Sequence, residues 1–328
     1  MRLVALLVGS VAVLAGCGGA GRSQTSGIAR AGGAGVVVSP SRTLAAPGCS
    51  TAADPGARLA GARTAMRSIA SSPFGVVSTA DGRWSFVASA RGIAVVSDAT
   101  FPPRVVRVTP LASGFHDSGL IGEIPTGIAP VGMAISPDGR RLYVTSELAG
   151  SRPLSNRRPG ATPGTLSVID LARAETSPAH ATLATVTAGC QPVRVAVSPD
   201  GRVVWVTARA SDRLLGFAAA RLTARPTAAL AADVRVGEAP VGLAVADQGR
   251  VIVVADSDRF DAPGQHAALT VVSADRALRG RPAVPGSLPA GGFPRELSVE
   301  PDGRTLLVAN FQSGQLEAVD LATLPSDF

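Results

Sequence analysis

The segment PVRVAVSPDGRVVWVTA, residues 192–208, decides the fold of this chain. Two apolar runs, residues 193–198 and 203–207, flank its Pro-Asp-Gly-Arg sequence. In such a turn the proline presets its own φ, the aspartate side chain caps backbone amides, and the glycine takes the left-handed conformation. The segment therefore predicts a β-hairpin.

The same hairpin pattern recurs along the chain. In five copies a proline is followed eight positions later by Asp or Gln and then by Gly-Arg, and these prolines are Pro73, Pro130, Pro192, Pro240 and Pro294. A third strand follows each hairpin, and a weaker fourth strand precedes the next proline, for example at residues 182–187. Four strands per repeat are typical of a β-propeller blade. The sequence predicts an all-β chain whose propeller has five four-stranded blades, and a sixth blade would require residues 98–120 to supply strands.

The ends of the propeller predict how its ring closes. The third strand of the fifth blade ends near Leu321, and too few residues follow it for a fourth strand. Residues 64–70 precede the first repeat proline, where a fourth strand belongs. We expect this N-terminal strand to pair with residues 315–321 and close the ring, because a sheet edge left open invites aggregation.

The second strand of each repeat carries a family resemblance. YVTS (143–146), WVTA (205–208) and LVAN (307–310) resemble the YVTN-type β-propeller repeat, and FVAS (86–89) and VVAD (253–256) are degenerate copies. The resemblance covers about residues 64–321 and implies a propeller. Family members often have more than five blades, so six or seven blades stay open for this chain. Members of this group are surface, periplasmic and secreted proteins, and some are similar to lactonases. Propellers host many unrelated activities, so the resemblance leaves the function open.

The N-terminus resembles that of a bacterial lipoprotein. Arg2 precedes an apolar run that is too short to span a bilayer, and Leu14-Ala15-Gly16-Cys17 resembles the lipobox. This implies a signal peptide at residues 1–16 and a lipid on Cys17, such as palmitate, although an ordinary signal peptide with a coincidental cysteine is the alternative. Residues 17–62 are predicted to be a flexible tether, rich in small residues, and 63–328 the propeller. We expect an extracytoplasmic protein anchored to a bacterial membrane through its lipid.

Composition narrows the functional classes. All 31 basic residues are arginine, which excludes lysine Schiff-base chemistry and the P-loop lysine. Aromatic residues make up only 4% of the chain and the arginines are dispersed, so nucleic-acid binding is not expected. The expected partners are the membrane, through the lipid anchor, and a protein, glycan or small-molecule ligand. The protein is expected to be a monomer.

Two cysteines remain once Cys17 is assigned to a lipid. Cys49 and Cys190 form an even pair in an exported protein, which favours a disulfide between them. The alternative is two unrelated thiols.

Two long loops share the propeller face that usually surrounds a binding site. They follow the second strands of the second and fourth repeats, and long loops in compact domains are often functional. Their polar residues are Glu147, Arg152, Asn156, Arg157 and Arg158 in one loop and Asp256, Asp258, Arg259, Asp261 and His266 in the other. The alternative is that these loops are solvent-exposed and take no part in binding.

The innermost strands carry a second set of candidates. Arg194 and Glu296 lie two positions after their repeat prolines, where the other blades have glycine, and Arg295 precedes Glu296. Polar residues at the centre of a ring suggest a ligand-facing pair. The alternative is a salt bridge between neighbouring strands.

The sequence contains one candidate metal site. Asp256, Asp258 and Asp261 offer hard oxygen ligands for Ca²⁺, but the segment lacks the glycine and terminal glutamate of an EF-hand loop. No other cofactor is expected.

The sequence favours a binding module over an enzyme. It has no Gly-x-Ser-x-Gly nucleophile elbow. The alternative is a lactonase-like hydrolase in which Glu296 or the aspartates hold a metal that polarises a lactone carbonyl.

Overall fold

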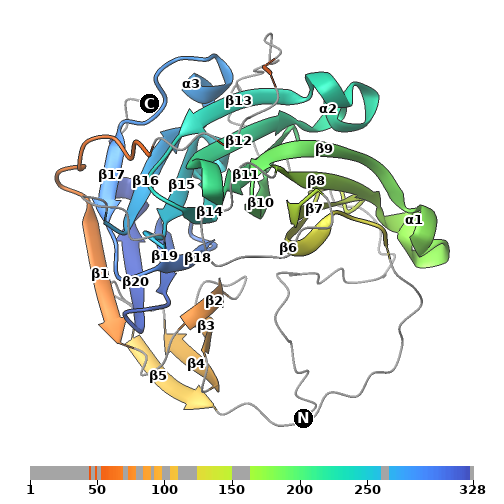
Figure 1. Ribbon diagram of the computed structural model, residues 1–328. Coiled ribbons are helices and arrows are strands. Elements are labelled where there is room, and N and C mark those ends of the chain that lie inside the picture. The colour runs from red at the N-terminus through yellow and green to blue at the C-terminus, as the bar shows by residue number, and fades with distance from the viewer. Residues whose placement is uncertain are drawn as a thin grey trace, which may run out of the picture.

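The computed structural model describes residues 44–45, 49, 53–68, 73–78, 84–89, 92–97, 104–109, 124–149, 163–259 and 266–325. These residues form five four-stranded antiparallel sheets arranged as the blades of a β-propeller (Figure 1). The predicted all-β fold class is confirmed.

The blades are numbered in chain order. Blade 1 contains β2 (Pro73–Ser78), β3 (Trp84–Ser89), β4 (Gly92–Ser97) and β5 (Arg104–Thr109). Blade 2 contains β6 (Ile128–Ile135), β7 (Arg141–Leu148), β8 (Pro163–Asp170) and β9 (Thr182–Cys190). Blade 3 contains β10 (Pro192–Val197), β11 (Val203–Ala208), β12 (Arg213–Ala218) and β13 (Leu230–Arg235). Blade 4 contains β14 (Pro240–Ala246), β15 (Val251–Asp256), β16 (Ala268–Ser273) and β17 (Gly286–Pro289), and blade 5 contains β18 (Pro294–Val299), β19 (Thr305–Asn310), β20 (Gln315–Asp320) and β1 (Arg63–Ser68).

Short helices follow the third strands. They are α1 (Leu171–Thr176), α2 (Ala219–Ala224) and α3 (Ala274–Leu278). The 3-10 turns lie at Pro178–His180, Arg209–Ser211, Pro226–Ala228, Asp247–Gly249 and Leu321–Thr323. Within the described ranges, no helix has the length and apolar character needed to cross a membrane.

The predicted exchange of the N-terminal strand is confirmed. β1 pairs antiparallel with β20, with Arg63 opposite Asp320 and Ser68 opposite Gln315. Part of the stretch that a sixth blade would have needed forms β5, the fourth strand of blade 1. Blade 5 therefore joins the two ends of the propeller in one sheet.

The hairpin turns follow the chemistry of their sequence. In blade 3, the Ser198 hydroxyl donates a hydrogen bond of 2.5 Å to Oδ1 of Asp200, and the Arg202 amide donates one of 3.0 Å to the same atom. Gly201 has φ +73°, which glycine adopts without a steric cost. The turn therefore fixes the register of β10 against β11.

Each inner strand begins with the same irregularity. The register shifts immediately after the repeat proline in all five blades. The residue before the proline has a positive φ in four described blades: Ala129 (56°), Gln191 (50°), Ala239 (51°) and Phe293 (53°). This conformation is uncommon for residues other than glycine. It turns the chain sharply into the inner strand.

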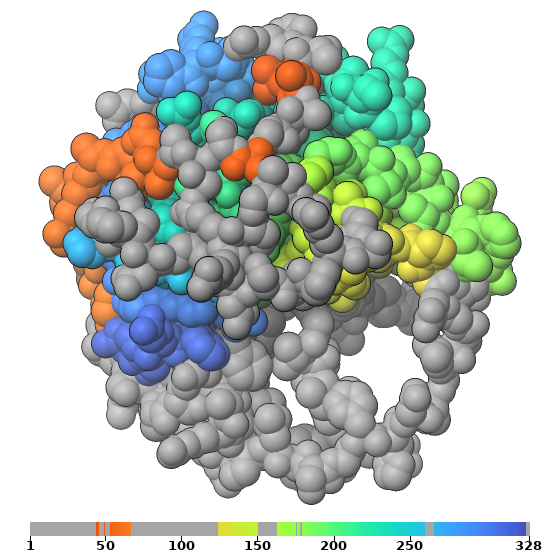
Figure 2. All heavy atoms as spheres, viewed as in Figure 1, coloured from red at the N-terminus to blue at the C-terminus, as the bar shows by residue number. Residues whose placement is uncertain are grey.

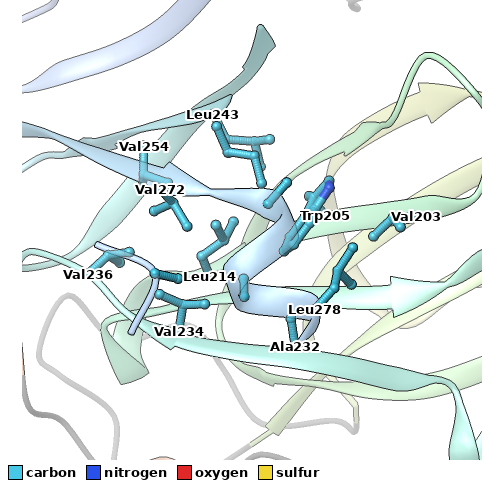
Figure 3. Close-up of a cluster of buried hydrophobic side chains, with 14 of the residues drawn as sticks. Val203, Trp205, Leu214, Ala232, Val234, Val236, Leu243, Val254, Val272 and Leu278 are labelled. Carbon is cyan, nitrogen blue, oxygen red and sulfur yellow. The ribbon is translucent and has the colours of Figure 1, made fainter. Parts of the chain in front are cut away.

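The hydrophobic core lies between neighbouring blades. Between blades 3 and 4, Trp205 and Leu214 pack with Leu243, Val254 and Val272 (Figure 3). Trp205 is only 1% exposed. Gly216 lies against its ring, where a Cβ atom would approach a ring carbon to 2.6 Å. The glycine thus makes room for the tryptophan.

The last part of the predicted tether lies on the propeller. The Asp54 amide donates to the Val236 carbonyl at 2.6 Å. The Leu59 amide donates to Ser287 at 2.7 Å, and the Ser287 amide donates to Ala57 at 2.8 Å. Figure 2 shows these orange-red residues on the surface of the molecule. The described residues 53–62 are therefore attached to the propeller through backbone hydrogen bonds.

Candidate functional site

Two chain positions meet at the end of the propeller where the inner strands begin, which we call the mouth. One directly precedes the repeat proline, and the other directly follows the YVTN-like segment of the same blade. In blades 3, 4 and 5 the second position donates its amide to the carbonyl of the first: Arg209 to Gln191 at 3.0 Å, Ser257 to Ala239 at 3.2 Å, and Phe311 to Phe293 at 2.9 Å. The bulge after the proline and the positive φ before it accompany this juxtaposition in blades 3, 4 and 5.

Arg209 is largely enclosed at this mouth, with 12% of its side chain exposed. Its Nη2 donates to Oε1 of Glu147 at 2.8 Å and to Oε1 of Gln191 at 3.2 Å. Its Nε is buried without a hydrogen-bond partner. Burial lowers the pKa of Arg209, Glu147 raises it, and the charges of Arg259 and Arg295 lower it further. The guanidinium therefore lies in a site that is poorly hydrated and already positive.

Arg194 and Glu296 form an ion pair across blade 4. Nη2 and Nε of Arg194 each lie 2.9 Å from Oε2 of Glu296. β14 lies between their strands, and its residue at the same repeat position is Gly242. A Cβ atom at Gly242 would lie 2.4 Å from Cδ1 of Leu297. Glycine therefore permits close blade packing and keeps a third side chain out of the way of the pair.

Two arginines lie over aromatic rings beside this pair. The rings of Phe293 and Phe311 meet edge to face with centroids 5.6 Å apart. The Cζ atom of Arg259 lies 5.9 Å from the centroid of Phe293, and that of Arg295 lies 5.4 Å from the centroid of Phe311. These are cation–π distances. Burial lowers the pKa of Arg295, and the charge of Arg194 lowers it too.

We call this group of side chains the arginine cluster. Its members are Glu147, Gln191, Arg194, Arg209, Arg259, Phe293, Arg295, Glu296 and Phe311. Four arginines face two glutamates, so the cluster carries an excess of positive charge. Guanidinium groups match the planar geometry of carboxylate and phosphate oxygens and can bind them through two hydrogen bonds. The arrangement is chemically suited to an anion.

Asp256 lies elsewhere, in the interior of blade 4. Oδ2 of Asp256 accepts a hydrogen bond of 2.5 Å from the Thr270 hydroxyl. Burial raises the pKa of Asp256 well above the usual range for an aspartate, and the charge of Asp212 raises it too. Burial thus disfavours the charged form of this carboxyl, which is the form that binds Ca²⁺.

Of the other two members of the predicted calcium site, Asp258 is half-buried and Asp261 lies outside the described residues. His266, predicted as a ligand-binding residue, is exposed. Over the described ranges, no three His, Cys, Asp or Glu side chains are grouped as a metal site would require.

Cys49 and Cys190 are joined by a disulfide, with their Cα atoms 5.2 Å apart. Cys190 directly precedes Gln191 of the arginine cluster, so the bond ties the N-terminal segment to the mouth of the propeller. Cys17, Arg157 and Arg158 lie outside the described residues.

Sequence reasoning missed four members of the cluster. Gln191, Arg209, Phe293 and Phe311 were not among the candidates, although the repeat aligns them. Arg209 and Phe311 follow their YVTN-like segments as Glu147 follows its own, and Gln191 and Phe293 precede their repeat prolines. These four residues could have been identified by aligning the residues directly before each repeat proline and directly after each YVTN-like segment.

The four-stranded blades, and the pair of positions that recurs at the mouth, define this chain as a β-propeller. The comparisons with known proteins agree. The family model described as "Lactonase, 7-bladed beta-propeller" matches residues 121–262. No curated protein matches the sequence.

Two similar solved structures are of low sequence identity. A functionally unknown protein from Desulfotomaculum acetoxidans is 14% identical with a TM-score of 0.40, over 72% of this chain and 62% of that one. This chain therefore spans less than two thirds of that protein. A putative 6-phosphogluconolactonase from Bacteroides uniformis is 15% identical with a TM-score of 0.41, over 72% of this chain and 77% of that one.

Proposed function

We propose that this chain is an exported, lipid-anchored β-propeller that acts as a binding module, and that its arginine cluster binds an anionic ligand. The observation that carries the proposal is that three partly buried arginines (Arg194, Arg209 and Arg295), together with the exposed Arg259, outnumber the two glutamates at the mouth. Burying a cation without a counter-charge costs free energy. A bound anion would supply the missing counter-charge and so offset that cost. The arginines would in turn bind the anion.

The geometry supports this role. Glu147 and Gln191 satisfy only Nη2 of Arg209, and its buried Nε has no hydrogen-bond partner, so the guanidinium is not fully paired within the protein. Arg259 and Arg295 are oriented by the two phenylalanine rings, which also present apolar surface to a ligand. Both features are typical of a small-molecule site with a few fixed polar groups.

Calorimetric titration with inorganic phosphate and with citrate tests the proposal. We expect at least one of them to bind the wild type, and Arg295→Gln to bind it about 10-fold more weakly or worse, because a hydrogen bond to a charged group contributes about 1.5–3 kcal/mol. Arg225→Gln is the matched control, since Arg225 is exposed at the end of α2. The absence of saturation up to about 10 mM, or an equal loss in both variants, would contradict it.

The lipid anchor rests on the lipobox resemblance at Cys17. Cells grown with radiolabelled palmitate are expected to label the wild type and leave Cys17→Ser unlabelled, because the thiol would carry the lipid. Equal labelling of both proteins would exclude Cys17 as the attachment site.

A lactonase-like hydrolase is the second candidate, and the family model matched over residues 121–262 supports it. A screen of lactone hydrolysis together with metal analysis of the purified protein separates the two functions. Hydrolysis that is lost with a chelator and restored by a metal would favour the enzyme. Anion binding without hydrolysis of any lactone would favour the binding module.

A further inference from the structure

A cavity of about 630 Å³ lies at the outer edge of the propeller, where blades 3 and 4 meet. One side of it is β13, the outermost strand of blade 3, and another is the segment 280–284, which follows α3 of blade 4. Leu44 and Asp54 of the N-terminal segment also line it. Its volume is in the usual range of small-molecule sites. None of its lining residues belongs to the arginine cluster, so the cavity is a separate location.

The inner side of the cavity is apolar. Its residues there are Ala231 and Val234 of β13, Ala277 of α3, and Ala283, and all four are buried. They belong to the core between blades 3 and 4, in which Figure 3 labels Val234. α3 packs against β13 in this core (Figure 1). A ligand in the cavity would therefore contact hydrocarbon on this side.

Two alanines explain why there is space here. Ala231 lies nine positions before the next repeat proline, where the outer strand of the preceding blade, β9, carries Leu183. Ala277 is the fourth residue of α3, where α2 carries Leu222. Leu183 and Leu222 pack in one cluster at the junction of blades 2 and 3, and Leu222 is fully buried. At the junction of blades 3 and 4 a methyl group stands in place of each leucine side chain.

The rim of the cavity is charged. Arg235 of β13 and Arg281 are exposed, and neither forms an ion pair with another described residue. Asp233 is already paired, since its Oδ1 lies 3.4 Å from Nη1 of Arg213. Asp54 is the other acidic residue of the lining. Two arginines without an ion-pair partner therefore outnumber it, and the rim favours an anionic group.

We propose that this cavity binds an amphiphilic anion, an aliphatic chain that ends in a carboxylate or a phosphate. The chain lies against the alanines and Val234, and the head group is bound by Arg235 and Arg281. Guanidinium groups bind either head group through two hydrogen bonds. Each CH₂ group that leaves water for an apolar surface adds to the affinity. The proposal does not depend on a ligand in the arginine cluster.

Calorimetric titration of the full chain with hexanoate, octanoate and octyl phosphate tests the proposal. Octanoate is expected to bind about 15-fold more tightly than hexanoate, because each of its two additional CH₂ groups contributes a factor of about 4 when it is buried. Comparing octanoate with octyl phosphate identifies the preferred head group. The absence of saturation up to about 10 mM with both octyl compounds would overturn the proposal, and so would equal affinities for hexanoate and octanoate.

Filling the cavity provides a matched test. Ala277→Leu introduces the residue that α2 has at the equivalent position, so the variant is expected to keep its fold. It should bind octanoate at least about 10-fold more weakly, because the leucine side chain displaces CH₂ groups of the ligand from the apolar surface. Ala220→Leu is the control, since Ala220 is exposed on α2. Wild-type affinity in a folded Ala277→Leu protein, checked by circular dichroism, would contradict the site.

Arg281→Gln tests the head group without a change in the core. It is expected to weaken octanoate binding about 10-fold, because a hydrogen bond to a charged group is lost. The exposed Arg225→Gln is the control. Hydrogen exchange locates the ligand, and octanoate should slow the exchange of amides in 231–235 and 280–284. Unchanged affinity in Arg281→Gln, slowing confined to other segments, or a loss of binding in Arg295→Gln alone would overturn the proposal.

Discussion

Replacing Trp205 with alanine is expected to lower the free energy of unfolding by about 3–5 kcal/mol, the usual cost of truncating a large buried aromatic residue. Trp205 is 1% exposed and belongs to the core between blades 3 and 4. Its removal leaves a cavity that the rigid strands on either side cannot fill by collapse. Urea denaturation followed by circular dichroism measures the change.

Gly216 provides a control for the cause of that loss. Gly216→Ala is expected to cost about 1–3 kcal/mol in the wild type, because the added Cβ would lie 2.6 Å from the Trp205 ring. In the Trp205→Ala background the same change should cost much less, since the ring is gone. Additive effects of the two substitutions would show that they do not share a packing site.

Replacing Cys49 with serine is expected to lower the free energy of unfolding by about 2–5 kcal/mol. The disulfide joins residues 141 positions apart, so it restricts a long stretch of the unfolded chain. Reductant should destabilise the wild type to the same extent and leave Cys49→Ser unchanged. Urea midpoints measured with and without reductant give both values.

A matched variant separates this effect from a general effect of losing a cysteine. Cys17→Ser should unfold at the same urea concentration as the wild type, because Cys17 is not part of the bond. An unchanged midpoint for Cys49→Ser would show that the bond contributes nothing to stability.

The strands were predictable because their signals are local. Proline, aspartate and glycine at fixed spacing define each hairpin turn without reference to the rest of the fold. The closing strand was predictable for a different reason, since the last blade lacked a strand and residues 64–70 had none to pair with. β1 and β20 meet as expected.

The candidate site was only partly predictable because it depends on the curvature of the ring. The sequence identified Arg194 and Glu296 as opposite charges at one repeat position, but their contact across β14 follows from the arrangement of three blades. Arg209 and Gln191 meet because of a backbone turn with positive φ, which the pattern of apolar and polar residues does not encode.

The N-terminal segment makes contacts that its composition does not reveal, for a similar reason. Residues 53–62 have the composition of a tether, yet they contact blades 3 and 4 through backbone hydrogen bonds to Val236 and Ser287. Backbone groups are the same in every residue, so composition cannot reveal such contacts. These contacts depend on which strands lie next to the segment in the folded protein.

The position of the disulfide also decides how the fold would bear a mechanical load. Cys49 precedes β1 in the chain, and its bond leads to Cys190 at the end of blade 2. Tension applied at the N-terminus therefore enters the propeller through a covalent bond and bypasses the hydrogen bonds between β1 and β20. The sheet that closes the propeller is shielded from any pull that reaches the protein from that end.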